Sequence, residues 1–227
     1  MELYQNRIVV KVGTSTLTNA SGKSDLRAMD SLARVLADVH NMGCEVILVS
    51  SGAIAVGSHK LHMKSRPTSL RMKQAAASVG QCSIMYLYDK FFGDYDKTIG
   101  QILFNADDIE QEEKKDNLIH TFDALLEMGV IPIVNENDSV SYTEIESEDR
   151  LFGDNDILSA VVAVLCKAGK LILLSDIDGL YSSDPRLHPN AKLLERIDCI
   201  DERIYAIAGG AGSKRGTGGM KTKLRAA

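Results

Sequence analysis

Five short apolar runs of strand length alternate with segments of helical character along this chain of 227 residues. Continuous apolar runs of this kind are typical of parallel strands that are buried on both faces of a sheet. Strands that alternate with helices predict βαβ units, in which helices cover both faces of the sheet. We therefore expect an α/β fold with a doubly wound, mainly parallel open sheet. The expected strands are residues 8–12, 45–50, 98–104, 130–134 and 170–175.

The segments between these runs have the periodicity of amphipathic helices. Ser24 is a suitable N-cap for a helix over residues 25–41, and Gly43 suits its end. A second long helix is expected from Pro67 to about Tyr88. Small residues within it favour close packing against another helix; they are Ala75, Ala76, Ala77 and Gly80. Further helices are expected within 107–128, over 157–167 and 201–208, and from 220 onward, while residues 144–150 suit an exposed hairpin or flap and residues 182–190 a loop.

The composition limits the classes of partner and compartment. A formal net charge of −5 argues against a nucleic-acid partner or an anionic membrane surface. No apolar run approaches the roughly 18 residues that a membrane span needs, and no signal peptide opens the chain. The four cysteines form no CxxC pair, which is typical of reduced thiols and indicates no metal site built from them. We therefore expect a cytoplasmic protein.

Lys11 lies inside the first apolar run, where a charged side chain is unexpected. A lysine that is buried without a partner would lose its charge or cost several kcal/mol. Gly13, Thr14 and Ser15 follow directly, at the carboxyl end of the expected strand, which is where ligands bind in open α/β sheets. Lys11 therefore either reaches a phosphate held by this turn or belongs to an edge strand and extends to water.

Small and polar residues also follow other expected strands. Residues 51–57 could bring backbone amides close to a ligand, with Ser51 donating to a carboxylate, although an ordinary strand-to-helix turn has a similar sequence. Residues 135–138 form either a turn or a ligand-binding edge, and Glu136, which is not a typical turn residue, favours the edge. Residues 153–156 precede an expected helix, so their acidic side chains either cap it or bind substrate and orient a lysine.

A glycine-rich segment over residues 209–219 precedes the last expected helix, which carries lysines one turn in. Backbone amides of such a segment, followed by lysines, are a phosphate-binding arrangement. The spacing matches neither GxxxxGK[ST] nor GxGxxG, and a flexible hinge would have a similar sequence. The segment therefore indicates a phosphate site without proving one.

Taken together, the motifs resemble those of the amino acid kinase family, in family order from residue 7 to 227. The match is closest to the branch that phosphorylates L-glutamate. The motifs that carry the resemblance are Val10–Ser15, Ser51–Gly57, Asn135–Asp138, Gly153–Asp156 and Gly216–Lys223. The resemblance implies one amino acid kinase domain over residues 1–227.

The chain departs from the family pattern in three places. Residues 147–152 resemble a short insertion, and Ser175 stands where a threonine is expected. The chain ends at Ala227, inside an expected helix, so the family's last strands and the RNA-binding-like domain that many members of this branch carry are absent from it. We expect a truncation rather than a natural end.

The resemblance also implies roles for individual residues. Lys11 and Lys223 would clamp the phosphoryl group in transfer, and Asp156 would hold both lysines in place. The substrate-binding set would be Ser51, Gly52, Asn137, Asp138 and Asn155, with Asp138 on the ammonium and Ser51 on the carboxylate. The ATP-binding set would be Lys11, Gly13, Ser175, Asp176, Thr217, Gly218, Gly219, Met220, Lys221, Thr222 and Lys223. No residue is expected to form a dedicated metal site.

The implied activity is transfer of the γ-phosphoryl group of ATP, with Mg²⁺, to the γ-carboxylate of L-glutamate, the first step of proline biosynthesis. A carboxylate acceptor is ionised at neutral pH and needs no general base, and the five histidines all lie outside the motifs. The resemblance further implies feedback inhibition by L-proline and a homo-oligomer, either a dimer or a tetramer. Family members that act on acetylglutamate, aspartate, carbamate or uridylate are alternatives, although Asp138 favours a free ammonium and counts against acetylglutamate and uridylate. A regulatory nucleotide-binding module without catalysis is a further alternative.

Overall fold

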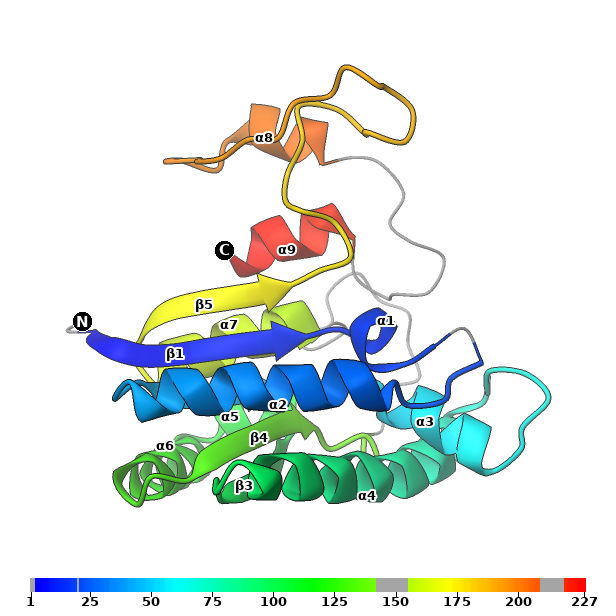
Figure 1. Ribbon diagram of the computed structural model, residues 1–227, viewed down its shortest axis with the longest axis vertical. Helices are drawn as coiled ribbons and strands as arrows, with labels where there is room; N and C mark the ends of the chain where they lie inside the picture. The colour runs from blue at the N-terminus through cyan, green and yellow to red at the C-terminus, as the bar shows by residue number, and fades with distance from the viewer. Residues whose placement is uncertain (1–2, 20, 142–154, 209–218) are drawn as a thin grey trace.

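A computed structural model describes residues 3–19, 21–141, 155–208 and 219–227. Its centre is a sheet of five parallel strands in the order β3-β4-β2-β1-β5, which confirms the α/β open-sheet prediction (Figure 1). Strand β1 pairs with β2 on one side and β5 on the other, so it is an interior strand. The strands are β1 (Tyr4–Val12), β2 (Glu45–Val49), β3 (Ile99–Phe104), β4 (Ile131–Glu136) and β5 (Ala168–Leu174).

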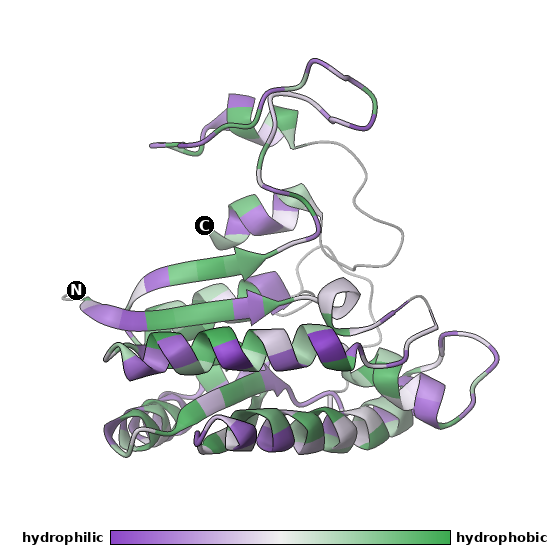
Figure 2. Ribbon diagram, in the orientation of Figure 1, coloured by the Kyte–Doolittle hydropathy of each residue, from purple (hydrophilic) through white to green (hydrophobic). Residues whose placement is uncertain are grey.

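Helices cover both faces of the sheet. One face packs against α2, α3 and α4, and the other packs against α6 and α7. Figure 2 shows apolar residues concentrated on the strands, while the helices carry both apolar and polar residues. The helices in the described ranges are α1 (Thr14–Leu17), α2 (Leu26–Asn41), α3 (Ala53–Lys60), α4 (Leu70–Asp94), α5 (Ala106–Glu110), α6 (Glu112–Glu127), α7 (Asn155–Leu165), α8 (Glu202–Ile207) and α9 (Met220–Ala226).

Successive residues of each strand face opposite helical layers. This alternation decides which layer each polar residue at the carboxyl ends of the strands faces. In β1, Val10 and Val12 pack with α2, α3 and α4, whereas Val9 packs with α6 and α7. Lys11, two residues after Val9, therefore faces the α7 layer. The same alternation applies in β4. Ile133 packs in the α4 layer, so Asn135, two positions later, faces α4 as well.

Helices α3 and α4 approach each other closely at two glycines. A Cβ on Gly57 would lie 1.7 Å from the carbonyl oxygen of Ala76, and one on Gly80 would lie 1.8 Å from that of Ala53. Neither distance is compatible with any side chain larger than hydrogen. The prediction that small residues of this helix serve close packing is confirmed for Ala76 and Gly80 and wrong for Ala75, which is exposed. Helix α4 is fixed against α3 along this contact.

Several predicted boundaries were wrong by a few residues. Asp25 rather than Ser24 caps α2, because its carboxylate accepts the backbone N–H of Ala28 at 3.0 Å. Helix α4 begins after Ser69, not at Pro67, and extends six residues beyond Tyr88. The helix predicted within 107–128 is two helices separated at Gln111, and β4 extends to Glu136, so the first two residues of the polar cluster belong to the strand.

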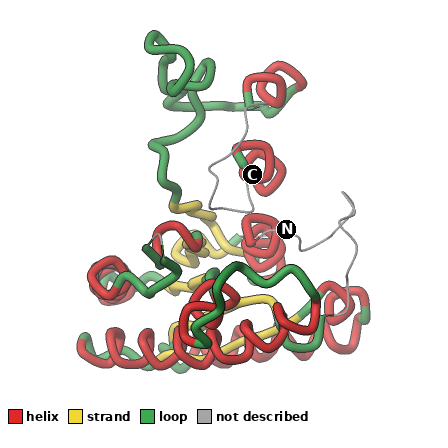
Figure 3. The backbone as a smooth tube through the Cα atoms, turned by 90° about the vertical axis from the view of Figure 1, so that its right-hand side faces the viewer, coloured by secondary structure: helices red, strands yellow, loops and turns green. Residues whose placement is uncertain are grey.

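The segment after β5 projects from the layers of the sheet (Figures 1 and 3). Between β5 and α8 it forms no helix or strand, which agrees with the loop predicted over 182–190; Tyr181 and Leu193 form an isolated bridge. A small third core, containing Leu180, Ala208 and Leu224, joins this segment to α9. The predicted flap at 144–150 and the glycine-rich residues 209–218 lie outside the described residues. No helix in the described ranges is long and apolar enough to cross a membrane.

Candidate active site

Lys11 is buried near the carboxyl end of β1, with 6% of its surface exposed. Its neighbours in the sheet are Val49 of β2 and Leu173 of β5. The alternative of an edge-strand lysine that extends to water is therefore wrong. Because Lys11 faces the α7 layer, its ammonium meets the first turn of that helix.

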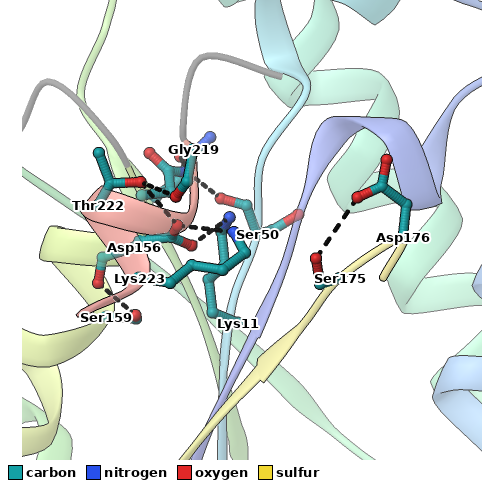
Figure 4. A network of polar contacts seen from close by, with 11 residues as sticks. Lys11, Ser50, Asp156, Ser159, Ser175, Asp176, Gly219, Thr222 and Lys223 are labelled. Carbon is teal, nitrogen blue, oxygen red and sulfur yellow. Dashed lines mark hydrogen bonds and ion pairs between the residues drawn. The ribbon is translucent and has the colours of Figure 1, made fainter. Parts of the chain in front are cut away.

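Asp156, in the first turn of α7, joins Lys11 to a second lysine (Figure 4). Lys11 Nζ lies 2.6 Å from Asp156 Oδ1, and Lys223 Nζ from α9 lies 2.9 Å from Asp156 Oδ2. Asp156 has no exposed surface. Burial alone would raise the pKa of its carboxyl, but the hydrogen bonds and charges of Lys11 and then Lys223 outweigh burial, so the pKa lies below its ordinary value. The carboxylate therefore stays ionised and separates two ammonium groups.

The Lys11–Asp156–Lys223 cluster carries two cations and one anion, so its formal charge is +1. The hydroxyl of Thr222 lies 3.3 Å from Asp156 Oδ2 and donates at shorter range, 2.7 Å, to the carbonyl of Gly219. A Cβ on Gly13 would lie 3.7 Å from Lys11 Nζ, so the turn after β1 passes directly beside the ammonium. Excess positive charge at the carboxyl edge of a parallel sheet suits an anionic ligand such as a phosphoryl group.

The predicted substrate-binding residues follow the adjacent strands β2 and β4. The backbone N–H of Ser50 donates to the carbonyl of Val134 at 2.9 Å, so the carboxyl ends of these strands lie side by side. Ser51 is buried. Gly52 has a φ of 95°, a left-handed conformation that suits glycine, and the space where its Cβ would lie borders Thr14 after β1. Asn137 and Asp138, beyond the end of β4, are both half-buried.

Asn155 links the ends of β2 and β4 through its side-chain amide. Its Nδ2 donates to the backbone carbonyl of Ser50 and, at 2.9 Å, to Oδ1 of Asn135. Both amide hydrogens are therefore used within the protein. Any further contact of this side chain must be made by its carbonyl oxygen, an acceptor suited to an ammonium group.

The predicted nucleotide-binding residues lie in separate places. Ser175 and Asp176 are exposed just beyond β5, with the Ser175 hydroxyl 3.4 Å from Asp176 Oδ1 (Figure 4). Gly219 is the N-cap of α9, so Met220, Lys221 and Thr222 form its first turn. Thr217 and Gly218 lie outside the described residues. Among the described residues, no hydrogen bond or ion pair joins Ser175 or Asp176 to the lysine cluster.

Sequence reasoning missed four residues that support this site. Asn135 belongs to one of the motifs, but no role in the site was predicted for it. None was predicted for Ser50, Gln81 or Tyr88 either. Asn135 Nδ2 donates to Gln81 Oε1 at 2.9 Å, and the hydroxyls of Ser50 and Tyr88 lie 3.0 Å apart. The available signal was position in the strand. Ser50 lies two residues after Leu48, and Asn135 two residues after Ile133, so each faces the same layer as that apolar residue, the layer that contains α4.

Within the described ranges, no group of three or more His, Cys, Asp or Glu side chains is placed to hold a metal ion. The lysine cluster suits phosphate oxygens rather than a bare cation. A magnesium ion that arrives on the phosphates of ATP needs few protein ligands, so these residues are compatible with Mg²⁺ in that form.

Comparison with known proteins agrees with this geometry. The model of the amino acid kinase family matches residues 6–227. Glutamate 5-kinase of Clostridium perfringens is 55% identical over 221 residues, which are 97% of this chain and 82% of that protein. Glutamate 5-kinase of Listeria monocytogenes serovar 1/2a is 53% identical, covering 97% of this chain and 80% of that protein.

A solved structure supports the fold alone. The product complex of isopentenyl phosphate kinase from T. acidophilum superimposes with a TM-score of 0.56 at 16% identity, covering 83% of this chain and 78% of that chain. The family model matches nearly the whole chain, so it shows family membership, which this structural likeness at 16% identity does not. The chain belongs to the amino acid kinase family.

Proposed function

We propose that this chain transfers the γ-phosphoryl group of ATP to the γ-carboxylate of L-glutamate, giving L-glutamyl 5-phosphate, the first step of proline biosynthesis. The observation that carries the proposal is the pair of ammonium groups held on one buried carboxylate at the carboxyl edge of the sheet. The relatives named glutamate 5-kinase, at 53 and 55% identity, support the choice of acceptor.

The lysine cluster would act mainly by positioning and by electrostatic stabilisation. Phosphoryl transfer passes through a loose transition state whose charge is spread over the phosphoryl oxygens. Lys11 on β1 and Lys223 on α9 would bind those oxygens from two different elements. Asp156 would fix the distance between the lysines, because each of its oxygens holds one of them. Groups arranged before the reaction need no reorganisation when charge develops.

The acceptor side would hold L-glutamate by its α-amino acid end. Asp138 would pair with the ammonium, and Ser51 would donate to the α-carboxylate, with Gly52 and Asn137 lining the same turn region. The carbonyl oxygen of Asn155 would add an acceptor for the ammonium, because its amide nitrogen is already engaged. The free γ-carboxylate, ionised at neutral pH, would attack without a general base.

ATP would lie between the ends of β1, β5 and α9. Ser175 and Asp176 would contact the nucleoside, Gly13 would border the phosphates, and residues 217–223 would enclose the phosphates with backbone and side-chain donors. Mg²⁺ bound to the phosphates would offset their negative charge, leaving the two lysines to contact the phosphoryl group itself.

The proposal has three further parts, of which the resemblance implies the first two. L-proline would inhibit at or beside the glutamate site, since it shares the α-ammonium and α-carboxylate but has nothing to phosphorylate. The chain would form a homo-oligomer. It would act in the cytoplasm, which is supported by four free cysteine thiols, the state expected in a reducing compartment.

A hydroxamate assay, which traps the acyl phosphate, tests the proposal. Glutamate and aspartate are supplied at equal concentration with ATP and Mg²⁺. We expect a preference for glutamate on the order of 10²-fold, because aspartate is one methylene shorter and its carboxylate would miss in-line geometry by about 1 Å. Preference for aspartate would overturn the choice of acceptor. Added millimolar L-proline should inhibit, and indifference to it would remove the regulatory part alone.

A further inference from the structure

A partly buried chain of side-chain amides runs from α4 to the proposed acceptor site. Gln81 of α4 accepts from Asn135 Nδ2 at 2.9 Å, and Asn135 Oδ1 accepts from Asn155 Nδ2 at 2.9 Å. Asn155 also donates to the Ser50 carbonyl. The proposed function uses only the last member of this chain, Asn155, and gives the other two no role.

Two backbone groups fix the direction of every hydrogen bond in the chain. The carbonyl of Ser50 can only accept, so the atom of Asn155 that faces it must be the amide nitrogen. The backbone N–H of Glu136 donates to Asn135 Oδ1 at 3.0 Å, so that atom must be the oxygen. Asn135 therefore presents its NH₂ to α4, where an acceptor is required, and Gln81 Oε1 supplies it.

Helix α4 is well suited to hold that acceptor in place. Gly80, the residue before Gln81, packs directly on the backbone of α3 at Ala53. Seven residues further along α4, on the same face of the helix, Tyr88 is fully buried and its hydroxyl lies 3.0 Å from that of Ser50. The helix therefore contacts both strand ends that Asn155 bridges.

Gln81 also shows a feature that stability alone does not explain. Its Nε2 is buried and has no hydrogen-bond partner among the described residues, although a buried donor is normally paired. Gln81 thus leaves its nitrogen unpaired while its oxygen is directed to Asn135. An unpaired buried nitrogen is a cost, and the oxygen of the same side chain makes the one described hydrogen bond that could offset it.

We propose that Gln81 is a positioning residue for the acceptor site: by holding Asn135, it stabilises the orientation of the Asn155 amide that the two backbone groups set. With that amide fixed, Asn155 presents its carbonyl oxygen, and not its NH₂, to the substrate ammonium. Without the acceptor at position 81, the Asn135 amide keeps only its bonds to the Glu136 N–H and to Asn155, so it holds Asn155 less firmly. The inference rests on the proposed function, since it assigns Asn155 to L-glutamate.

Steady-state kinetics of three variants test the proposal. Gln81→Met keeps the length of the side chain but removes the oxygen, and we expect it to raise KM for glutamate on the order of tenfold while KM for ATP changes less than about twofold. Gln81→Glu retains an acceptor oxygen and should restore KM for glutamate to within about threefold of wild type. Gln101→Met, the same change at an exposed position of β3, should change neither constant. Equal effects on both substrates, or no effect, would overturn the role of Gln81.

A double-variant cycle tests whether Gln81 acts through Asn155. In an Asn155→Ala background, Gln81→Met should add nothing to the increase in KM for glutamate, because the group that it positions is gone. Full additivity of the two changes would contradict the proposed route.

A measurement without turnover separates this inference from the proposed function. In ¹H–¹⁵N spectra of the free protein, the side-chain amide signals of Asn155 and Asn135 should lose protection from solvent exchange in Gln81→Met but keep it in Gln81→Glu. Unchanged protection in Gln81→Met overturns the inference whatever the substrate is. Absence of glutamate-dependent ADP release in the wild type, with the protection pattern as expected, overturns the proposed function instead.

Discussion

Strand β1 carries a buried cation near each end, and the two cations are paired in opposite ways. At the amino end, Arg7 donates to Glu45 at 2.7 Å, to Asp123 at 3.0 Å and to the carbonyl of Cys166 at 2.8 Å. Its guanidinium also lies 4.3 Å from the centre of the Tyr4 ring. At the carboxyl end, Lys11 shares a single carboxylate with a second lysine.

The two groups differ in their net charge. The Arg7 group has one cation and two carboxylates, so its cation is fully neutralised. Burial alone would lower the pKa of Arg7, but its hydrogen bonds to Glu45 and Asp123 outweigh burial and raise the pKa, so it stays charged. The lysine cluster keeps a surplus positive charge. The Arg7 group connects β1, β2, α6 and the end of α7 and is structural. The lysine cluster needs an anion to neutralise its charge, as expected of a binding site.

The largest effect is expected from Arg7→Met, which tests the structural half of this comparison. Removing the cation leaves two carboxylates and a carbonyl without their partner, at a cost in unfolding free energy of about 3 kcal/mol, the lower end of the range for buried pairs because both carboxylates can regain water. Urea unfolding measures this loss. The kcat of the folded fraction should stay within about twofold of wild type, and a large fall in kcat would show that the amino end takes part in function.

A somewhat smaller effect is expected when an anion completes the lysine cluster. Mg–ATP at about one hundred times its Kd should raise the unfolding free energy by about 2.7 kcal/mol, which thermal unfolding detects as a higher Tm. At the same ATP concentration, Lys223→Met should show a clearly smaller rise, whereas Arg7→Met should show the full rise from its lower starting Tm. An equal rise in Tm on adding Mg–ATP in the two variants would contradict the claim that only the lysine cluster binds the anion.

The smallest effect concerns pH and Asp156. Because the pKa of this carboxyl is lowered in the folded state, its ionisation stabilises the fold above the ordinary value of 3.8, and this contribution is lost as the pH falls through the folded-state pKa. The difference in unfolding free energy between wild type and Asp156→Asn should therefore be constant above about pH 5 and shrink in more acidic solution. Urea unfolding over this range checks it, and a difference that grows toward low pH would contradict the paired state of Asp156.

Much of the fold could be predicted because the interior strands β1, β2 and β4 are largely buried on both faces. A run such as Ile8–Val12 has no alternation and short length, which together indicate a parallel strand. The spatial order of the strands could not be predicted, since β4 and not β3 lies beside β2, and strand order depends on packing between distant segments. The cap of α2 was misplaced because Ser24 and Asp25 are both good caps, and only the hydrogen bond to Ala28 distinguishes them.

The candidate site divides in the same way. Lys11, Asp156 and Lys223 were predicted from motifs, and the structure brings all three together. Gln81 lies in no motif, and Asn135 lies in one that gave no sign of its partner, because their hydrogen bond joins residues 54 apart in the sequence. Contacts of this kind depend on how α4 lies across the ends of the strands, which no local pattern encodes.

The central claim is that the lysine pair, and not merely the fold around it, performs phosphoryl transfer. The most direct test is kcat for glutamate-dependent ADP release by Lys223→Met, whose side chain is 18% exposed and can lose its charge with little effect on folding. The account predicts a fall in kcat on the order of 10²-fold or more, with circular dichroism unchanged and the Tm of the free protein close to that of wild type. A folded Lys223→Met variant with near-normal kcat would contradict it.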